Sequence, residues 1–151
     1  MSESFIGNGS IKHLKSILEC SSFKRIFLVT GKNSFNLSGA KDSLHKYLKN
    51  KEVYRFSEFD VNPKIEDVKK GVKIIKSFLP DALIAIGGGS VIDMGKLINI
   101  IAVQPYTSIK KIIIGENLIV KKGLPLIAIP TTAGAGSEAT QFATAYISNK
   151  K

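Results

Sequence analysis

The feature that most constrains the fold of this chain is an alternation between short, mostly apolar runs and longer segments with helical periodicity. Residues 25–30, 52–56, 81–86 and 124–129 have the length and composition of strands. Between them, apolar residues recur at three- and four-residue steps, which predicts helices over 38–50, from 65 to Pro80 and from Gly89 to about 101. Strands that alternate with helices predict an α/β fold, a Rossmann-like parallel sheet with helices on both faces.

Two later segments are harder to assign. Residues 142–147 are a candidate last strand, whereas 105–123 shows no clear pattern, and 112–114 fits either the end of a short helix or a strand. The 151 residues suffice for one domain with a hydrophobic core. We therefore expect residues 1–151 to form a single α/β domain.

The chain is strongly basic, with 22 Lys and Arg against 12 Asp and Glu and a net charge of +10. Such an excess suits an anionic ligand or nucleic acid. The lysines are scattered over predicted helix faces and are not interleaved with aromatic residues. We interpret them as a solvated surface and do not expect nucleic acid to be the partner.

Metal-binding and membrane-spanning classes have little support. The single cysteine, Cys20, excludes an internal disulfide and a thiolate metal cluster, and His13 and His45 are too few for a histidine site. No apolar run approaches the ~18 residues of a membrane span, and the first residues do not resemble a secretory signal. We expect a cytoplasmic protein with no metal site in this chain.

The run Gly87-Gly88-Gly89-Ser90 lies between a predicted strand and a predicted helix. Glycines let the backbone turn sharply and approach a ligand, and the helix start offers unpaired N–H groups and a positive dipole end. Ser90 adds a hydroxyl donor. The run matches neither the dinucleotide fingerprint G-x-G-x-x-G nor a Walker A loop, so the two interpretations are a phosphate site and a structural tight turn.

Asp93 and Lys96 follow at three-residue spacing, which places them on one face of that helix. They form either a surface ion pair or a charge-balanced pair beside the phosphate loop. The stretch 129–140, which contains Thr131, Thr132, Ser137 and Thr140, supplies hydroxyls and glycine turns after another strand. It suits contacts with ribose or phosphate, or else a loop that caps a helix through Ser137 or Thr132.

These two stretches, 85–96 and 129–140, together resemble the iron-containing alcohol dehydrogenase family. Weaker similarities lie upstream: 5–11 resembles that family's opening strand and turn, 29–32 the end of its first nucleotide strand, and 61–63 its Asn-Pro turn. The resemblance implies the N-terminal nucleotide domain of a dehydroquinate synthase-like fold, which is followed in the family by an all-helical domain.

The resemblance also implies which residues contact the cofactor. Gly88, Gly89 and Ser90, with Gly87, would line the pyrophosphate of NAD(P), and Asp93 would lie near the nicotinamide. Further contacts would come from four loop residues: Asn62, Thr131, Thr132 and Thr140. Ser137 would stand in the adjoining loop. A complete enzyme would exchange hydride between the nicotinamide and an alcohol or aldehyde, with iron or another divalent metal as Lewis acid.

Gly31 bears on the choice between NAD and NADP. Many NAD-preferring members have Asp at the matching position, where it would accept from the ribose 2′-OH and repel a 2′-phosphate. Gly31 removes that repulsion and Lys32 could add attraction, which favours NADP slightly. The alternative is that Gly31 only ends the strand.

The sequence departs from the family at its end. The metal ligands belong to the helical domain, which would begin after about residue 150. We therefore expect a fragment, a natural truncation or half of a split enzyme, inactive by itself. Its uncovered face would allow self-association or association with a helical domain.

Two other functions remain open from the sequence. One is a dehydroquinate synthase-like or glycerol(-phosphate) dehydrogenase-type enzyme on the same scaffold. The other is a non-catalytic fragment that binds nucleotide or nucleic acid.

Overall fold

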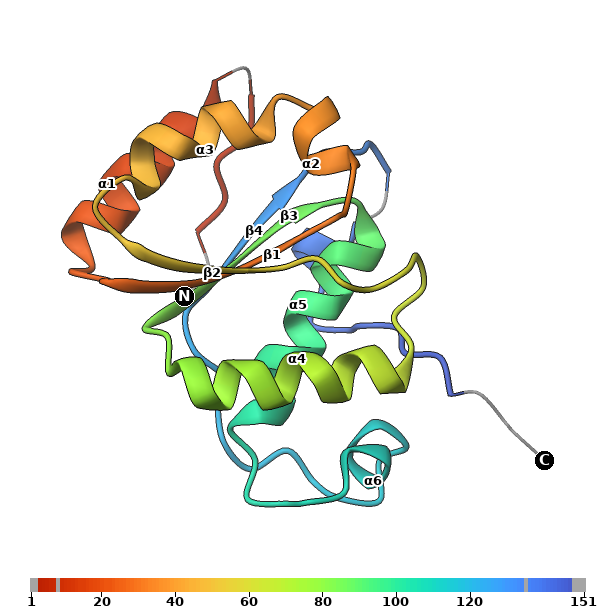
Figure 1. The fold of residues 1–151 in the computed structure, drawn as a ribbon. Helices are drawn as coiled ribbons and strands as arrows, with labels where there is room; N and C mark the ends of the chain where they lie inside the picture. The colour runs from red at the N-terminus through yellow and green to blue at the C-terminus, as the bar shows by residue number, and fades with distance from the viewer. Residues whose placement is uncertain (1–2, 8, 135, 148–151) are drawn as a thin grey trace.

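The computed structural model describes residues 3–7, 9–134 and 136–147. Its centre is a sheet of four parallel strands in the order β2-β1-β3-β4 (Figure 1). The strands are β1 (Arg25–Thr30), β2 (Glu52–Phe56), β3 (Ala82–Gly87) and β4 (Leu126–Pro130). The predicted strands are thus confirmed, although β3 and β4 begin one and two residues later than the apolar pattern indicated.

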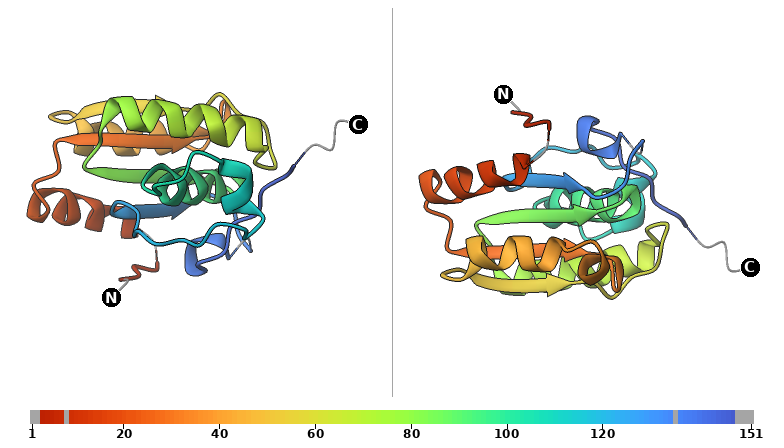
Figure 2. Two further views of the ribbon diagram at one scale, coloured as in Figure 1. Left: turned by 90° about the horizontal axis from the view of Figure 1, so that it is seen from below. Right: turned by 90° about the horizontal axis from the view of Figure 1, so that it is seen from above.

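Helices cover both faces of the sheet, as predicted (Figures 1 and 2). One face carries α1 (His13–Cys20), α2 (Ser34–Leu37) and α3 (Ala40–Leu48). The other carries α4 (Ile65–Phe78), α5 (Gly89–Ala102) and α6 (Ile109–Ile113). Two short 3₁₀ helices, η1 (Ser10–Lys12) and η2 (Ser137–Ala139), complete the described elements.

Side-chain alternation along the strands divides the core into two layers. In β1, Phe27 and Val29 pack with the α4 and α5 side, whereas Ile26 and Leu28 pack with the side of α1, α2 and α3. Every residue of β3 is buried because this strand lies between two others and under both helical layers. The burial of both faces explains why the strands are continuously apolar.

Two predicted strands are absent from the described residues. Residues 142–147 form only an isolated bridge between Tyr146 and Lys64, with Tyr146 donating its N–H to Pro63 O over 2.7 Å. This segment runs past the start of α4 and does not join the sheet. Residues 3–6 are irregular and lead into η1, so the opening strand suggested by the family resemblance is not observed.

The stretch 105–123 contains α6 and a loop fixed by a buried amide. Gln104 Oε1 accepts the N–H groups of Val120 and Lys121 over 2.9 and 3.1 Å, and its Nε2 donates to Lys121 O over 2.8 Å. Within the described ranges, no helix is long and apolar enough to cross a membrane.

Candidate functional site

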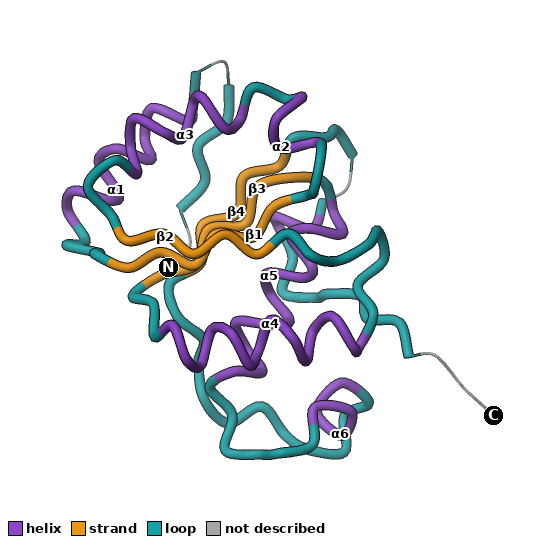
Figure 3. The backbone as a smooth tube through the Cα atoms, in the orientation of Figure 1, coloured by secondary structure: helices purple, strands orange, loops and turns teal. Residues whose placement is uncertain are grey.

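In parallel sheets, the crevice that binds ligands lies outside the carboxyl ends of two neighbouring strands that the chain leaves toward opposite faces, and β1 and β3 are such a pair. After β1 it passes to α2 on one side of the sheet, and after β3 it passes to α5 on the other (Figure 3). Ligands of open parallel sheets bind at such a topological switch point. Gly31 follows β1 and Gly87–Ser90 spans the end of β3, so these predicted site residues lie at the two sides of the crevice.

The glycine loop opens α5 without a side-chain cap. Gly88 is the N-cap residue, and its carbonyl accepts the N–H groups of Val91 and Ile92 over 3.0 and 3.2 Å. The first turn of a helix leaves further N–H groups without backbone partners, and no side chain among the described residues caps them. The loop therefore presents unpaired donors and the positive end of a 14-residue helix.

Close packing explains why the loop consists of glycines. A Cβ at Gly87 would lie 2.7 Å from Val91 Cγ2, and a Cβ at Gly88 would lie 3.3 Å from Thr132 Oγ1. A side chain at Gly88 would occupy the space between the β3 and β4 loops. Gly88, Gly89 and Ser90 are themselves half-buried, and without side chains the two glycines let a ligand such as a pyrophosphate approach the backbone.

The loops after β2 and β4 converge on the same place. Asn62 donates its backbone N–H to Ser90 Oγ over 3.2 Å, and Thr131 donates its N–H to Gly87 O over 2.9 Å. Asn62 has a φ of 65°, a left-handed conformation that Asn tolerates better than most residues. The structure thus brings Asn62, Ser90 and the two threonines Thr131 and Thr132 together around the glycine loop.

Asp93 and Lys96 do not form the surface ion pair considered from their spacing. Asp93 Oδ2 accepts the N–H of Thr144 over 3.3 Å, and Lys96 Nζ donates to Thr140 O, Thr140 Oγ1 and Phe142 O over 2.7, 3.3 and 2.8 Å. Burial lowers the pKa of Lys96, against the opposing effect of Asp93 and Glu138. Both side chains bind the backbone of the segment 140–144 along α5, because that segment offers acceptors and a donor at closer range.

The helix-capping interpretation of Ser137 and Thr132 is wrong for the described residues. Ser137 is the first residue of η2, whose N-cap is Gly136 and has no side-chain hydrogen bond. Thr132 lies in the irregular stretch after β4. A helix of three residues has few free N–H groups for a side-chain cap to bond. Helix η2 packs against α5 and β4.

The sequence analysis missed Arg55, which lies in β2 beside the end of β1. Its Nε donates to Thr30 Oγ1 over 2.8 Å, and its Nη2 donates to the carbonyls of Gly31 and Lys32 over 3.0 and 3.1 Å. Its guanidinium carbon lies 4.8 Å from the centre of the Phe35 ring. The available signal was a lone cation one residue before the end of the strand that pairs with β1.

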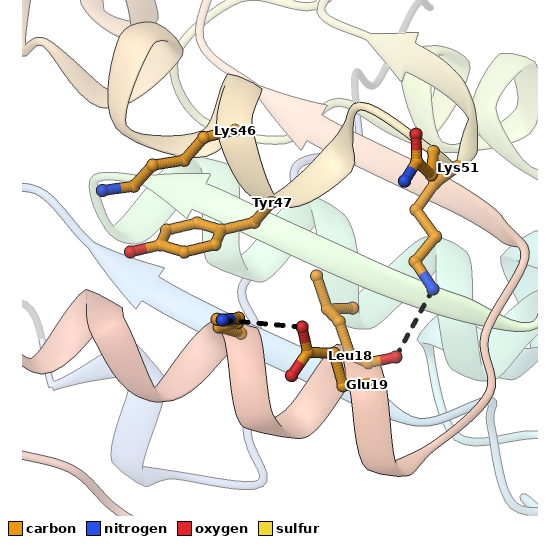
Figure 4. Close-up of a pocket in the computed structure, with 7 residues that line it drawn as sticks. Leu18, Glu19, Lys46, Tyr47 and Lys51 are labelled. Carbon is orange, nitrogen blue, oxygen red and sulfur yellow. Dashed lines mark hydrogen bonds and ion pairs between the residues drawn. The ribbon is translucent and has the colours of Figure 1, made fainter.

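A hollow, shown in Figure 4, lies between α1 and α3. Lys46, Tyr47, Lys51, Leu18 and Glu19 line it, and Lys51 Nζ donates to the carbonyls of Leu18 and Phe23. It lies where α1 leads to β1 and α3 leads to β2, at the amino ends of these strands. Lys51 is already bonded to two carbonyls there, and parallel sheets bind ligands at the opposite edge.

Comparison with known proteins decides the family. The family model described as "Iron-containing alcohol dehydrogenase" matches residues 2–151. The chain belongs to the iron-containing alcohol dehydrogenase family. A long-chain primary alcohol dehydrogenase from Thermoanaerobacter ethanolicus is 34% identical over 152 residues, an alignment that covers 97% of this chain and 38% of the relative.

Solved structures of the iron-containing alcohol dehydrogenase family show the same fold. A sulfoacetaldehyde reductase from Bifidobacterium kashiwanohense in complex with NAD⁺ superposes with a TM-score of 0.79 at 26% identity, over 97% of this chain and 46% of that one. An iron-containing alcohol dehydrogenase from Thermotoga maritima gives 0.74 at 32% identity, over 85% of this chain and 35% of that one. The chain therefore spans less than half the length of these three proteins.

The residues described here do not form the metal site for which the family is named. No group of three or more His, Cys, Asp or Glu side chains lies together within 3–7, 9–134 and 136–147. We therefore assign no chemical step to a metal held by these residues.

Proposed function

We propose that residues 1–151 form an NAD(P)-binding domain and that the crevice between β1 and β3 holds the dinucleotide. The observation that carries this proposal is the uncapped start of α5, opened by glycines that leave the backbone accessible beside Thr132. Gly87, Gly88, Gly89 and Ser90 would surround the pyrophosphate. Both the bare N–H groups and the helix dipole favour a doubly anionic group there.

The remaining predicted residues would contact the rest of the cofactor. Asn62 and Ser90, joined by their hydrogen bond, would close one side of the pyrophosphate site, and Thr131 and Thr132 the other. Asp93 lies in α5, Thr140 is bonded to Lys96 of the same helix, and η2, which holds Ser137, contacts it. These three residues would contact the nicotinamide end.

We infer a preference for NADP over NAD from the other end of the crevice. Gly31 carries no carboxylate that would repel a 2′-phosphate, and the Ser34 hydroxyl occupies the place where a Cβ at Gly31 would lie. Lys32, however, is paired with Asp60 over 3.3 Å, so its charge is less available than its position in the sequence suggested. The similar reductase solved with NAD⁺ supports a nicotinamide dinucleotide, but does not distinguish the two forms.

In the complete enzyme, we propose, the cofactor exchanges hydride with the carbon of an alcohol or aldehyde. This chain would bind and orient the dinucleotide, while iron or another divalent metal and most substrate contacts would belong to residues outside it. Such a division predicts that residues 1–151 bind nucleotide but do not oxidise alcohols by themselves. Self-association or association with a helical domain would then cover β4, the half-buried strand at one edge of the sheet.

Calorimetric titration of the purified chain with NADPH, and separately with NADH, tests the proposal. We expect saturable binding with one site per chain, abolished in Gly88→Val and retained in the matched surface variant Ser16→Val on α1. A folded chain that binds neither dinucleotide would contradict the proposed function. Equal affinity of the chain for NADPH and NADH would be consistent with the pyrophosphate site but would contradict the preference for NADP.

A further inference from the structure

Arg55 places a cation directly against the loop that follows β1. The guanidinium contacts three consecutive residues, through Thr30 Oγ1 and the carbonyls of Gly31 and Lys32, at 2.8, 3.0 and 3.1 Å. The ring of Phe35, in α2, lies 4.8 Å from its central carbon. The planar group is therefore fixed in position at the same edge of the crevice as Gly31.

The charge of Arg55 has no carboxylate partner among the described residues. The neighbouring cations are different: Lys32 and Lys64 both pair with Asp60, over 3.3 and 3.4 Å. These two contacts hold the pKa of Asp60 below its ordinary value, so its negative charge persists. Asp60 balances only one of these two lysines, whereas the charge of Arg55 stands in direct contact with Gly31 O and has no carboxylate beside it.

Arg55 also has hydrogen-bond donors to spare. A guanidinium carries five N–H groups, and the observed bonds use one on Nε and two on Nη2. In the part of the chain that the structure describes, the Nη1 group has no acceptor, and the side chain is exposed. The two N–H groups on Nη1 diverge, so together with the full charge of the guanidinium they offer a phosphate a charge-assisted hydrogen bond.

We propose that Arg55 is the specificity-determining residue for NADP, and that it binds the 2′-phosphate of the adenosine ribose. The proposal rests on the proposed function, because it requires the adenosine to lie beside Gly31. Gly31 then contributes space and the absence of repulsion, and Arg55 contributes the attraction. In doubly wound sheets that bind dinucleotides, an Arg near the adenosine ribose accommodates the 2′-phosphate.

A purely structural role would give a different result on substitution. Arg55 holds Thr30, Gly31 and Lys32 together, so its loss could loosen the loop after β1. That loosening would weaken NADPH and NADH equally, because both share the same adenosine. Only direct contact with the 2′-phosphate makes the affinity for NADPH fall alone, so the ratio of the two affinities separates the roles.

The test is titration of the wild type and of Arg55→Gln with NADPH and NADH, at two salt concentrations. We expect Arg55→Gln to weaken NADPH by about 10- to 100-fold, the range for loss of one charge-assisted hydrogen bond, with NADH changed less than about twofold. The salt dependence of NADPH binding should fall with it. Arg55→Lys should keep part of the preference, because it retains the charge but loses the planar group that is fixed against the loop after β1.

Lys32→Gln is the matched control. It removes one formal charge from the same loop, but that charge is paired with Asp60, so we expect NADPH to weaken by only about two- to threefold. Arg55 is excluded as the determinant if Arg55→Gln leaves the affinity ratio unchanged, or if Lys32→Gln lowers it more. Those outcomes leave the proposed function standing. Failure of the wild type to bind either dinucleotide overturns both proposals.

Discussion

The backbone N–H of Asn62 is bonded to the side-chain oxygen of Ser90 over 3.2 Å, which ties the loop after β2 to the first turn of α5. The two residues are 28 positions apart in the sequence, and the bond makes them neighbours beside the glycine loop. Asn62 makes this bond from a left-handed backbone conformation, with φ at 65°, which Asn adopts more readily than most residues. The site is therefore assembled by a hydrogen bond between two predicted cofactor-binding residues.

Ser90→Ala tests this connection. It removes the acceptor for Asn62 and a hydroxyl donor to the pyrophosphate, so we expect the dissociation constants of NADPH and NADH to rise together, by about 5- to 20-fold. Calorimetry gives both constants, and Ser16→Ala, an exposed serine on α1, is the control. Unchanged affinity in Ser90→Ala would remove Ser90 from the site.

Gly88→Val tests the space between the β3 and β4 loops. A Cβ at Gly88 lies 3.3 Å from Thr132 Oγ1, so the larger side chain would fill the position proposed for the pyrophosphate. We expect binding to weaken by at least about 100-fold, while the circular dichroism spectrum stays close to that of the wild type. If Gly88→Val is folded and still binds NADPH normally, the pyrophosphate lies elsewhere.

The strands and most helices could be predicted from the sequence because their signals are local. Apolar runs such as Ile26–Val29 are buried on both faces and need no distant partner to be recognised. The glycine loop was also recognisable, since only a strand before it and a helix after it were required. Helix α5 begins at Gly89, where the apolar periodicity of the following residues placed it.

What the sequence did not reveal depends on contacts between distant residues. Residues 142–147 have a strand-like composition. In the structure, however, Lys96 and Asp93 bind backbone groups of Phe142 and Thr144, and the segment bridges to Lys64 and does not pair with β4. Arg55 is one cation among 22 basic residues, and its position beside Gly31 follows only from the parallel pairing of β1 with β2. Neither pairing has a local signal.

Asp81 gives the fold a defined sensitivity to acid. Its Oδ2 accepts the N–H groups of Lys24 and Arg25 over 2.7 and 2.8 Å, and these bonds lower the pKa of Asp81 from its ordinary value of 3.8. A lowered pKa in the folded state means that the carboxylate stabilises the fold above pH 3.8 and loses this effect as the pH falls through the folded-state pKa.

Asp81→Asn should therefore lower the thermal midpoint at neutral pH by roughly 2–4 °C, and the difference from the wild type should shrink as the pH falls below 3.8. Thermal unfolding followed by circular dichroism across this range measures it. Glu3→Gln, an exposed carboxyl without a described partner, is the control. A difference that stays constant with pH would show that the charge of Asp81 is not involved.

Gln104 is expected to be the most sensitive polar position outside the crevice. It is 3% exposed and holds the loop before β4 through bonds to Val120 and Lys121, with a further bond to Ile100 O over 2.8 Å. Gln104→Leu leaves these backbone groups without their partner, and an unpaired buried polar group costs about 1–3 kcal/mol. We expect the free energy of unfolding to fall by about 2–4 kcal/mol.

Urea titration measures that loss, and Gln141→Leu, an exposed glutamine, is the matched control with an expected change within about 0.5 kcal/mol. Because Gln104 lies at the opposite end of α5 from the glycine loop, NADPH affinity of the folded Gln104→Leu variant should match the wild type. Hydrogen exchange should locate the damage at the amide groups of Val120 and Lys121. Loss of stability without faster exchange at these two amides would contradict the assigned role of Gln104.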